Sequence, residues 1–210
     1  MPLPMVHLSV AVALFAKDGR FPPPDFLLGS ISPDAIHMRP NTGTLDKERV
    51  HLMELGASPP ALVQLFRTRY GMDGSHSMGF SAGYLTHLLT DFLWSRSVID
   101  PFRQKLSPTL PEKEVRVLYY RDTDRIDFDL YYRMPWRPQV WTSLKTAKAV
   151  DFASLLTAEE ITLWRDRTLL WFADPGHDSM VEPRYISSLD AQTFIDRAAR
   201  EISELFSISM

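Results

Sequence analysis

The sequence predicts an all-α fold, a multi-helix bundle with long, irregular N-terminal loops. Apolar residues recur at helical spacing through most of the 210-residue chain. The 16 prolines cluster between these periodic segments, where they separate helices instead of interrupting them. Strand-like alternation is confined to residues 114–120, whose flanks favour helix. The length and the 45% apolar content fit one globular domain that spans residues 1–210.

Four helices are expected in the N-terminal half. The first is a short apolar helix over about 5–16, and the second covers about 46–56. The third follows Ser58, which is placed to cap a helix with proline at its first position, a favoured start. A longer apolar-periodic stretch predicts the fourth helix from about 77 to 105.

Three further helices are expected in the C-terminal half. The first covers 111–133, a segment rich in aromatic and acidic residues. Thr157 and Glu160 then have the spacing of a capping box, which predicts the start of a helix over 161–172. The last helix covers about 188–206, with apolar residues repeating along one side.

An acid-rich run at residues 121–133, RDTDRIDFDLYYR, alternates aspartates with arginines. This alternation is typical of a solvated, salt-bridged helix face. The run lacks the glycine and the closing glutamate of a calcium-binding loop. We therefore expect its aspartates to be structural rather than metal-binding.

Composition excludes several classes of function. The net charge of −3 gives no basic excess, so no nucleic-acid partner is expected. The absence of cysteine excludes thiolate nucleophiles and cysteine-bound zinc, and it fits a reducing compartment. The apolar stretch 8–16 is too short to span a membrane and lacks the preceding basic residues of a signal peptide. We expect this stretch to be a buried helix of a cytoplasmic protein.

The most informative local motif is GYLTHLLTDFLW, residues 83–94. His87 and Asp91 are four residues apart, so a helix places them on one face, one turn from each other. The opposite face is fully apolar, which indicates a helix buried on both sides. A buried carboxylate must be paired or bound to a metal. The motif therefore predicts either a two-ligand metal clamp or a structural His–Asp hydrogen bond.

Three more polar residues lie in apolar surroundings. His7 stands at the start of the first apolar helix, and Asp34 follows the buried-looking segment LLGSISP. His51 is flanked by Val50 and Leu52. With His87 and Asp91 they make three histidines and two aspartates, the ligand mix that zinc favours.

The order of these residues resembles the zinc-dependent phospholipase C family, and more closely the small bacterial proteins grouped with it. The matching pattern is an early His, then Gly-x-x-x-Pro-Asp, a further His, and Gly-Tyr-Leu-x-His-x-x-x-Asp. It covers about the first 100 residues, and GYLTHLLTDFLW is its most specific part. The resemblance implies an all-α bundle of the phospholipase C/P1 nuclease type that hydrolyses phosphate esters.

The resemblance also implies which residues bind metal. His51, His87 and Asp91 would hold one ion, and His7 and Asp34 a second, with the N-terminal amino group as a further ligand in the family. Asp34 would also be the catalytic residue, orienting or deprotonating the attacking water. The family's further histidine after the His-x-x-x-Asp motif and its later His-x-x-x-Glu pair are missing here. We therefore expect one or two divalent transition-metal ions, zinc first among them, rather than three.

Two residues near Asp34 are candidates for substrate binding. His37 follows it by three positions, and Arg39 on the same segment could clamp an anion. The expected substrate is a small-molecule or lipid phosphate ester, and long helices offer surfaces for a homodimer. An ion in such a site would supply Lewis acidity, and Asp34 would act as general base.

Three other interpretations remain open from the sequence. A non-catalytic helical protein could use the same residues as a closed, structural metal site. A helical binding protein without metal could use the tryptophans of the C-terminal half, although aromatics at such spacing are more often core residues. The doublet His177–Asp178 is typical of HD-type phosphohydrolases, but Pro175 and Gly176 indicate a loop where that family has a helix.

Overall fold

The computed structural model describes residues 3–53, 56–72, 79–178 and 180–208. Over these residues the protein is all-α, as predicted, and the only strand-like pairing is an isolated bridge between Phe152 and Leu156. The α-helices are α1 (Pro4–Ala16), α2 (Pro24–Gly29), α3 (Thr44–Val50), α4 (Pro59–Arg69), α5 (Phe80–Trp94), α6 (Asp100–Leu106), α7 (Glu112–Arg133), α8 (Arg137–Thr146), α9 (Ala158–Trp171) and α10 (Ser188–Ile208). Segments η1 (Ser32–Met38) and η4 (Pro175–His177) are 3₁₀ helices, and η3 (Ser95–Ile99) is a π-helix.

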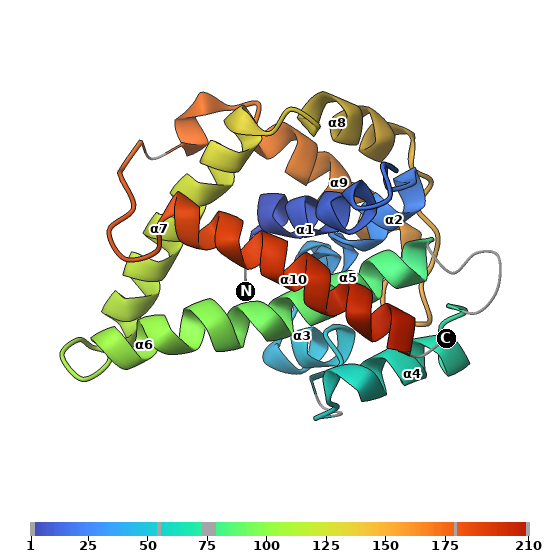
Figure 1. Cartoon of the computed structure of the whole chain (residues 1–210), viewed down its shortest axis with the longest axis horizontal. Coiled ribbons are helices and arrows are strands. Elements are labelled where there is room, and N and C mark those ends of the chain that lie inside the picture. Colours follow the sequence, from blue (N-terminus) through green and yellow to red (C-terminus); the bar gives the residue numbers. More distant parts are fainter. Residues whose placement is uncertain (1–2, 54–55, 73–78, 179, 209–210) are drawn as a thin grey trace.

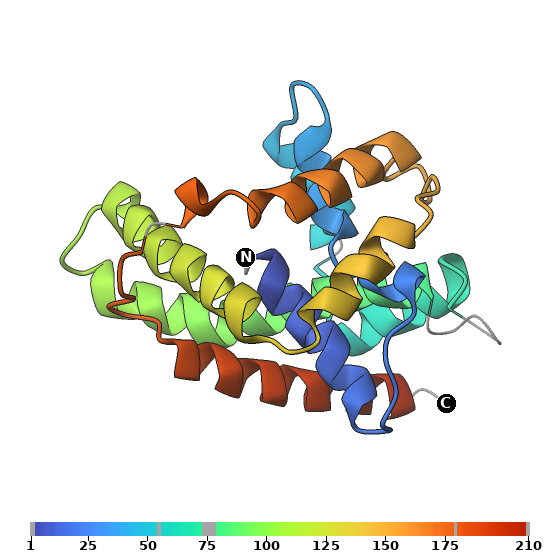
Figure 2. The same ribbon diagram turned by 90° about the horizontal axis from the view of Figure 1, so that it is seen from above.

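The longest feature of the molecule is a rod made of α5, η3 and α6, which follow one another without a break (Figure 1). This rod is the helix predicted over 77–105, of which residues 77 and 78 lie outside the described residues. Helix α1 packs against α10, α7 and α5, and all but three of its residues are buried (Figure 2). The prediction of a buried N-terminal helix is therefore confirmed. No helix among the described residues is long and apolar enough to span a bilayer.

Most helix starts follow the predicted signals. Helix α4 begins directly after Ser58 with proline at its first position, although the Ser58 side chain makes no capping hydrogen bond. Helix α9 begins at the capping box, where the Thr157 hydroxyl accepts from the Glu160 amide at 3.2 Å. Helix α3 ends at Val50, earlier than predicted, because Leu52 adopts a left-handed φ of 51° that cannot continue a helix. Helices α2 and α8 were not predicted; each begins with proline in its first turn, so the prolines there start helices as well as separate them.

Helices α2 and α5 cross unusually closely, and glycine makes the crossing possible. A Cβ added at Gly29 would overlap the Phe80 carbonyl oxygen, and a Cβ at Gly83 would overlap the Phe26 carbonyl oxygen. The two backbones therefore touch where other residues would hold them apart. This crossing brings the end of α2 against the middle of α5, where His87 lies.

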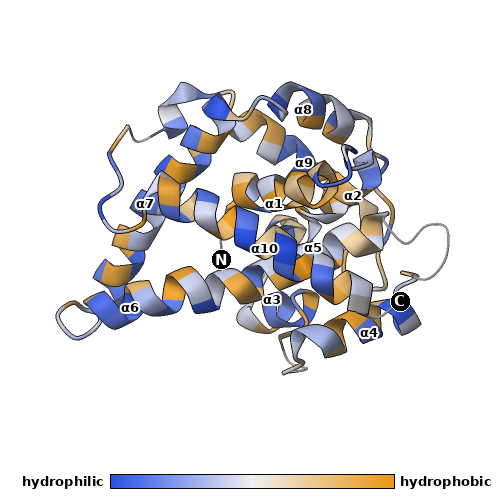
Figure 3. Ribbon diagram, in the orientation of Figure 1, coloured by the Kyte–Doolittle hydropathy of each residue, from blue (hydrophilic) through white to orange (hydrophobic). Residues whose placement is uncertain are grey.

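The expectation that the 121–133 aspartates form a solvated face is wrong for most of them. Asp122, Asp127 and Asp129 are buried, each less than 9% exposed. The salt-bridge part of the expectation is correct: Arg125 bridges Asp129 one turn away at 2.6 Å. Burial occurs because α7 is covered by α1 and by the chain leading into α10, and its polar residues follow no single outward face (Figure 3).

Candidate metal centre

The structure gathers all five predicted metal ligands into one cluster. His7 comes from α1, Asp34 from η1, His51 from the residue that ends α3, and His87 and Asp91 from α5. The three histidines are at most 7% exposed, and the Asp91 side chain is 14% exposed. Residues up to 84 positions apart in sequence, from His7 to Asp91, thus meet inside the bundle.

The donor atoms face one another at similar distances. The two carboxylate oxygens of Asp91 lie 3.5 Å from His7 Nε2 and 3.4 Å from His87 Nε2. His51 Nε2 lies 3.7 Å from Asp91 and 3.6 Å from Asp34 Oδ1. Two ligands on a tetrahedral zinc ion, each about 2.0–2.2 Å from it, are about 3.3–3.6 Å apart. The distances in the cluster therefore match those between two atoms bound to the same metal ion, and they are longer than those of direct hydrogen bonds.

These donor atoms have no hydrogen-bond partner among the described residues. Ten buried side-chain atoms there are unpaired, and seven of them belong to the cluster. They are His7 Nδ1, His7 Nε2, Asp34 Oδ1, His51 Nε2, His87 Nε2, Asp91 Oδ1 and Asp91 Oδ2. A buried, unsatisfied polar atom costs about 1–3 kcal/mol. So many unpaired nitrogen and carboxylate oxygen atoms in one place fit a site that binds a cation.

Backbone carbonyls fix the orientation of two of the histidines. His87 Nδ1 lies 2.9 Å from the Ser30 carbonyl at the end of α2, and His51 Nδ1 lies 3.0 Å from the Lys47 carbonyl. A carbonyl accepts, so each Nδ1 carries the proton and each Nε2 presents its lone pair to the cluster. This arrangement is the usual one for metal-binding histidines. It was not predictable from side-chain patterns, because both partners are backbone atoms.

The rings of His7 and His87 are stacked, with centroids 3.7 Å apart and planes inclined by 5°. The lone pair of an imidazole lies in the plane of its ring, so the lone pairs of these two rings lie in two nearly parallel planes. Asp91 offers a different oxygen to each ring. If ions bind here, this arrangement would suit two better than one, with Asp91 among the ligands of both.

The electrostatics of the cluster favour the metal-binding protonation state of His7, Asp34 and Asp91 and oppose it for His51. Burial, together with nearby His87, lowers the pKa of His7 to about 3, so this ring is neutral at pH 7. Burial by itself would raise the pKa of Asp34 and Asp91, but the surrounding histidines hold both below their usual range. The pKa of His51 is raised, because the two carboxylates outweigh the effect of its burial.

The cluster borders an open cleft of about 390 Å³, with His51 and Asp91 in its wall. The other lining residues are mainly apolar: Leu52, Met53, Ala57, Leu62, Leu88, Phe92 and Ile99. Among the described residues that line the cleft there is no lysine or arginine. The cleft could not be predicted from the sequence, because its walls come from separate segments that meet only in the fold. These are the segment after α3, helix α4, and the stretch from α5 to η3.

The two predicted substrate-binding residues lie outside the cluster. The His37 ring packs 5.8 Å from the Trp164 ring of α9. Arg39 binds Glu160 through two nitrogens, at 2.7 and 3.1 Å, and donates to the Leu155 carbonyl at 2.9 Å. Its guanidinium therefore fastens the end of η1 to α9 in this structure, and its role as an anion clamp stays a prediction.

The His177–Asp178 doublet is not a metal site. The His177 ring stacks on Trp171 at 3.7 Å, while the Asp178 carboxylate pairs with Arg125 at 3.0 Å. The two side chains thus serve different structural contacts. The predicted amino-terminal ligand lies outside the described residues.

Comparison with known proteins adds no further constraint on the site. No protein-family model matches the chain, and neither a characterised protein nor a solved structure with significant similarity was found. The geometry of the buried His–Asp cluster therefore carries the functional argument.

Proposed function

We propose that the protein is a metal-dependent hydrolase that acts on a phosphate ester, with two zinc ions held by His7, Asp34, His51, His87 and Asp91. Bound there, such ions supply Lewis acidity, which lowers the pKa of water toward neutrality and polarises a phosphoryl oxygen. The observation that carries the proposal is the set of seven buried, unpaired donor atoms beside an open cleft.

The division of ligands follows from the distances and the stacked rings. Asp91 would use one oxygen on the side of His7 and the other on the side of His87 and His51. Asp34 would complete the group, since its Oδ1 lies 3.6 Å from His51 Nε2 and its carboxylate comes within 4.8 Å of His7 and His87. His7 is neutral and Asp34 and Asp91 are ionised at neutral pH, the forms that bind a hard or borderline cation, whereas the raised pKa of His51 means that a cation would have to displace a proton there.

Asp34 is also the residue we assign to the attacking water. Its carboxylate is ionised at neutral pH, because the surrounding histidines hold its pKa below its usual range. One of its oxygens is buried without a hydrogen-bond partner, which leaves it free to accept from a water molecule or bind an ion. Its low pKa makes Asp34 stronger as an acceptor that orients water than as a base that keeps the proton.

The cleft indicates how a substrate would lie. The described part of its wall is mainly apolar and carries no lysine or arginine, so no basic side chain among these residues meets the charge of a phosphate group. The phosphate would instead lie at the His51–Asp91 end, and the apolar part of the ester would pack against residues such as Leu62 and Phe92. The geometry therefore favours an ester with an apolar alcohol group.

A closed structural metal site is the second candidate. It would account for the unpaired donors, and it would tie α1, η1 and the end of α3 to α5. The cleft that reaches His51 and Asp91 favours catalysis over this alternative, because a structural site is enclosed by its four protein ligands. A binding protein without metal would leave the seven donor atoms unpaired, at a cost that few proteins tolerate.

Metal analysis is the first test. Purified protein dialysed against zinc should contain about two equivalents by inductively coupled plasma mass spectrometry, and H87A/D91A should contain none. His177→Ala is the matched control, since His177 lies outside the cluster. An equal metal content in H87A/D91A and the parent protein would contradict the proposed ligands, provided that both retain native circular dichroism.

Activity is the second test. The zinc-loaded protein should hydrolyse aryl phosphate esters, and removal of the metal by a chelator should abolish hydrolysis until zinc is restored. Full metal content with no hydrolysis of mono- or diesters would support the structural alternative instead.

A further inference from the structure

The cleft beside the metal centre adjoins a second cavity along the same face of the rod. This cavity, about 480 Å³ in volume, lies between α6 and α7, and Ile99 lines both it and the cleft. Asp91 and Ser95 line the cleft, Arg103 lines the cavity, and these residues and Ile99 follow one another at intervals of four. Such a spacing keeps side chains on one side of a helix. The cleft and the cavity together therefore form one trough, which runs along the rod from Asp91 to Arg103.

The π-helical segment η3 keeps the middle of the trough straight and leaves it apolar. Residues at intervals of four drift round the axis of an α-helix, and the wider turn of η3 offsets this drift between Ser95 and Ile99. Ile99 is partly exposed there, and Met53, 66% exposed, lines another wall of the cleft. An alkyl chain would therefore find apolar contacts along this part of the trough.

The end of the trough at Arg103 is basic. Lys113 and Arg116 of α7 line it together with Arg103, and Glu112 is the one acid among its described lining residues. This lining has a net charge of +2, whereas the whole chain has a net charge of −3. The positive charge that the cleft lacks is thus present at the far end of the trough.

The three cations converge around Glu112. Arg103 binds the Glu112 carboxylate at 3.1 Å, Lys113 is the next residue, and Arg116 lies one helical turn further on the same face. Both partners of the Arg103–Glu112 pair are more than half exposed, at 55% and 67%, so the pair contributes little energy. The Arg116 guanidinium lies over the Tyr120 ring at 5.6 Å. A single carboxylate placed beside Glu112 would therefore meet more than one cation.

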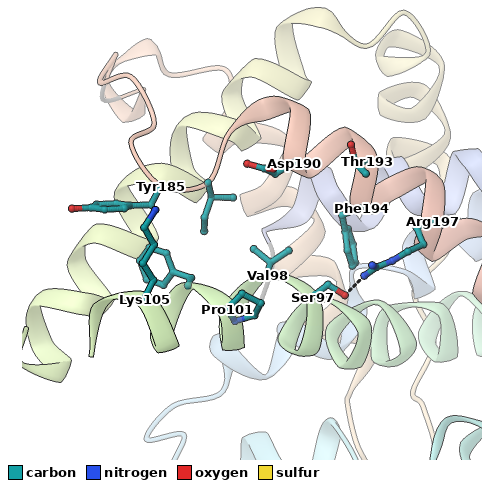
Figure 4. A pocket seen from close by; sticks show the side chains of 11 residues that line it. Ser97, Val98, Pro101, Lys105, Tyr185, Asp190, Thr193, Phe194 and Arg197 are labelled. Carbon is teal, nitrogen blue, oxygen red and sulfur yellow. Dashed lines mark hydrogen bonds between the residues drawn. The ribbon is translucent and has the colours of Figure 1, made fainter. Parts of the chain in front are cut away.

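The cavity on the other side of the rod lacks this convergence. It lies between α10 and the rod, with a volume of about 320 Å³ (Figure 4). Its two cations lie at opposite ends: Arg197 reaches Ser97, whereas Lys105 lies beside the Tyr185 ring. Positive charge is therefore gathered at one point in the cavity that adjoins the cleft, and not in this one.

We propose that the substrate is an elongated phosphate ester whose apolar alcohol part ends in a carboxylate. This inference rests on the proposed function, which puts the phosphate at the Asp91 end of the cleft. The alkyl part would lie along Ile99, and the carboxylate would bind Lys113 and Arg116, since a guanidinium can hold a carboxylate through two hydrogen bonds. The two acidic groups would be far apart, because the rod rises by about 18 Å from Asp91 to Arg103.

The carboxylate site is tested by itself in metal-free protein. Calorimetric titration with decanoate in EDTA should show one site, with affinity about tenfold lower in Lys113→Gln and in Arg116→Gln. Ile99→Ser should also weaken decanoate binding, because it removes an apolar contact with the chain. Arg133→Gln is the matched control, since Arg133 is exposed on the same helix and lies outside the trough. Absence of saturable binding up to millimolar decanoate, or unchanged affinity in both cation variants, would overturn the proposal.

Hydrolysis by the zinc-loaded protein tests the link to the metal centre. The KM for 12-(phosphonooxy)dodecanoate should be about tenfold lower than that for dodecyl phosphate, and Arg116→Gln should remove this difference without changing kcat. Equal KM values in the parent protein would overturn the proposal. Hydrolysis of neither ester, beside saturable decanoate binding, would contradict the proposed function while confirming the carboxylate site. Lys113 and Arg116 are exposed, so their variants should keep the parent fold, and circular dichroism checks this.

Discussion

At the scale of single residues, the cluster is organised by atoms that the sequence does not display. The pattern names His87 as a candidate ligand, but the Ser30 carbonyl decides which of its nitrogens faces the cluster. Tyr84, one turn earlier on α5, donates to the Val50 carbonyl at 2.6 Å and so anchors the end of α3 just before His51. These backbone contacts convert a set of polar residues into a site with defined lone pairs.

Asp34→Asn should lower hydrolysis at least a hundredfold and remove about one equivalent of zinc. The substitution keeps the size of the side chain but removes the charge that Asp34 offers beside His51 and His7. Metal content and hydrolysis of an aryl phosphate ester, measured on the same preparation, check it. Asp46→Asn is the control, since Asp46 lies outside the cluster, where it accepts from the Gly43 amide at 3.0 Å and lies 3.6 Å from Arg39. Unchanged activity in Asp34→Asn would exclude the proposed role.

The metal-free protein should lose stability as the pH falls from 6.5 to 5, because of His7. Its pKa is about 3 in the folded protein and 6.5 in the unfolded chain, so in this range the unfolded chain binds a proton that the folded protein does not. His7 should therefore contribute a fall of about 1.5 kcal/mol in the free energy of unfolding across this window. The lowered pKa values of Asp34 and Asp91 act below it, whereas the raised pKa values of His51 and Asp127 act in the opposite direction, so the contribution of His7 is read from the difference between the parent protein and a His7 variant.

Urea unfolding in EDTA at several pH values measures this effect. His7→Gln should flatten the dependence by about one proton, whereas His177→Gln, which changes an exposed histidine, should not. The same slope in His7→Gln and the parent protein would show that another group is responsible.

At the scale of helices, the close crossing of α2 and α5 positions the centre. The two glycines let the backbones touch, and the contact places the end of α2 beside the His87 ring. A larger residue at either position would separate the helices and withdraw the Ser30 carbonyl. In the GYLTHLLTDFLW motif, Gly83 therefore allows the close helix crossing and Tyr84 holds the end of α3, while His87 and Asp91 are the candidate ligands.

Gly83→Ala should destabilise the protein by about 1–3 kcal/mol and weaken zinc binding. Alanine favours helix over glycine by about 1 kcal/mol, but its methyl group would overlap the Phe26 carbonyl, and the overlap outweighs the propensity. Thermal unfolding and zinc titration measure both effects. Gly43→Ala is the control, because its Cβ would meet no atom closer than 3.9 Å. A stabilised Gly83→Ala variant would mean that the crossing relaxes without cost.

At the scale of the whole molecule, the His–Asp cluster brings together four elements: α1, η1, the end of α3, and α5. Helix α1 is fixed from the other side by α7, where the Asp127 carboxylate accepts from the Met5 amide at 3.0 Å. Burial raises the pKa of Asp127 well above its usual range. A bound metal would therefore complete a set of contacts that already hold α1 against α5, and its free energy of binding would add to the stability of the fold.

Removal of zinc should lower the melting temperature by about 10 °C. A ligand present at about a thousand times its dissociation constant stabilises by about 4 kcal/mol, and each kcal/mol shifts Tm by about 2–4 °C in a protein of this size. Calorimetry with zinc and with EDTA measures the difference, and H87A/D91A should show none. The same Tm in both conditions would contradict a metal centre that joins the four elements.

The sequence by itself determined the fold class, most helix starts and the five residues of the cluster. These depend on local physics: apolar periodicity, proline and capping signals, and the cost of burying unpaired His and Asp. The resemblance to zinc-dependent phospholipases added the order of the ligands and the expectation of phosphate-ester chemistry.

Only the tertiary structure decided how those residues are used. Arg39 looked free to bind an anion, but α9 places Glu160 against it. The aspartates of α7 looked solvated, but α1 and the segment before α10 cover them. The stacking of His7 on His87, the carbonyl of Ser30 and the cleft all depend on contacts between distant segments. Such contacts cannot be predicted from periodic patterns in the sequence. Each depends on how whole helices pack against one another, and not on residues that are adjacent along the chain.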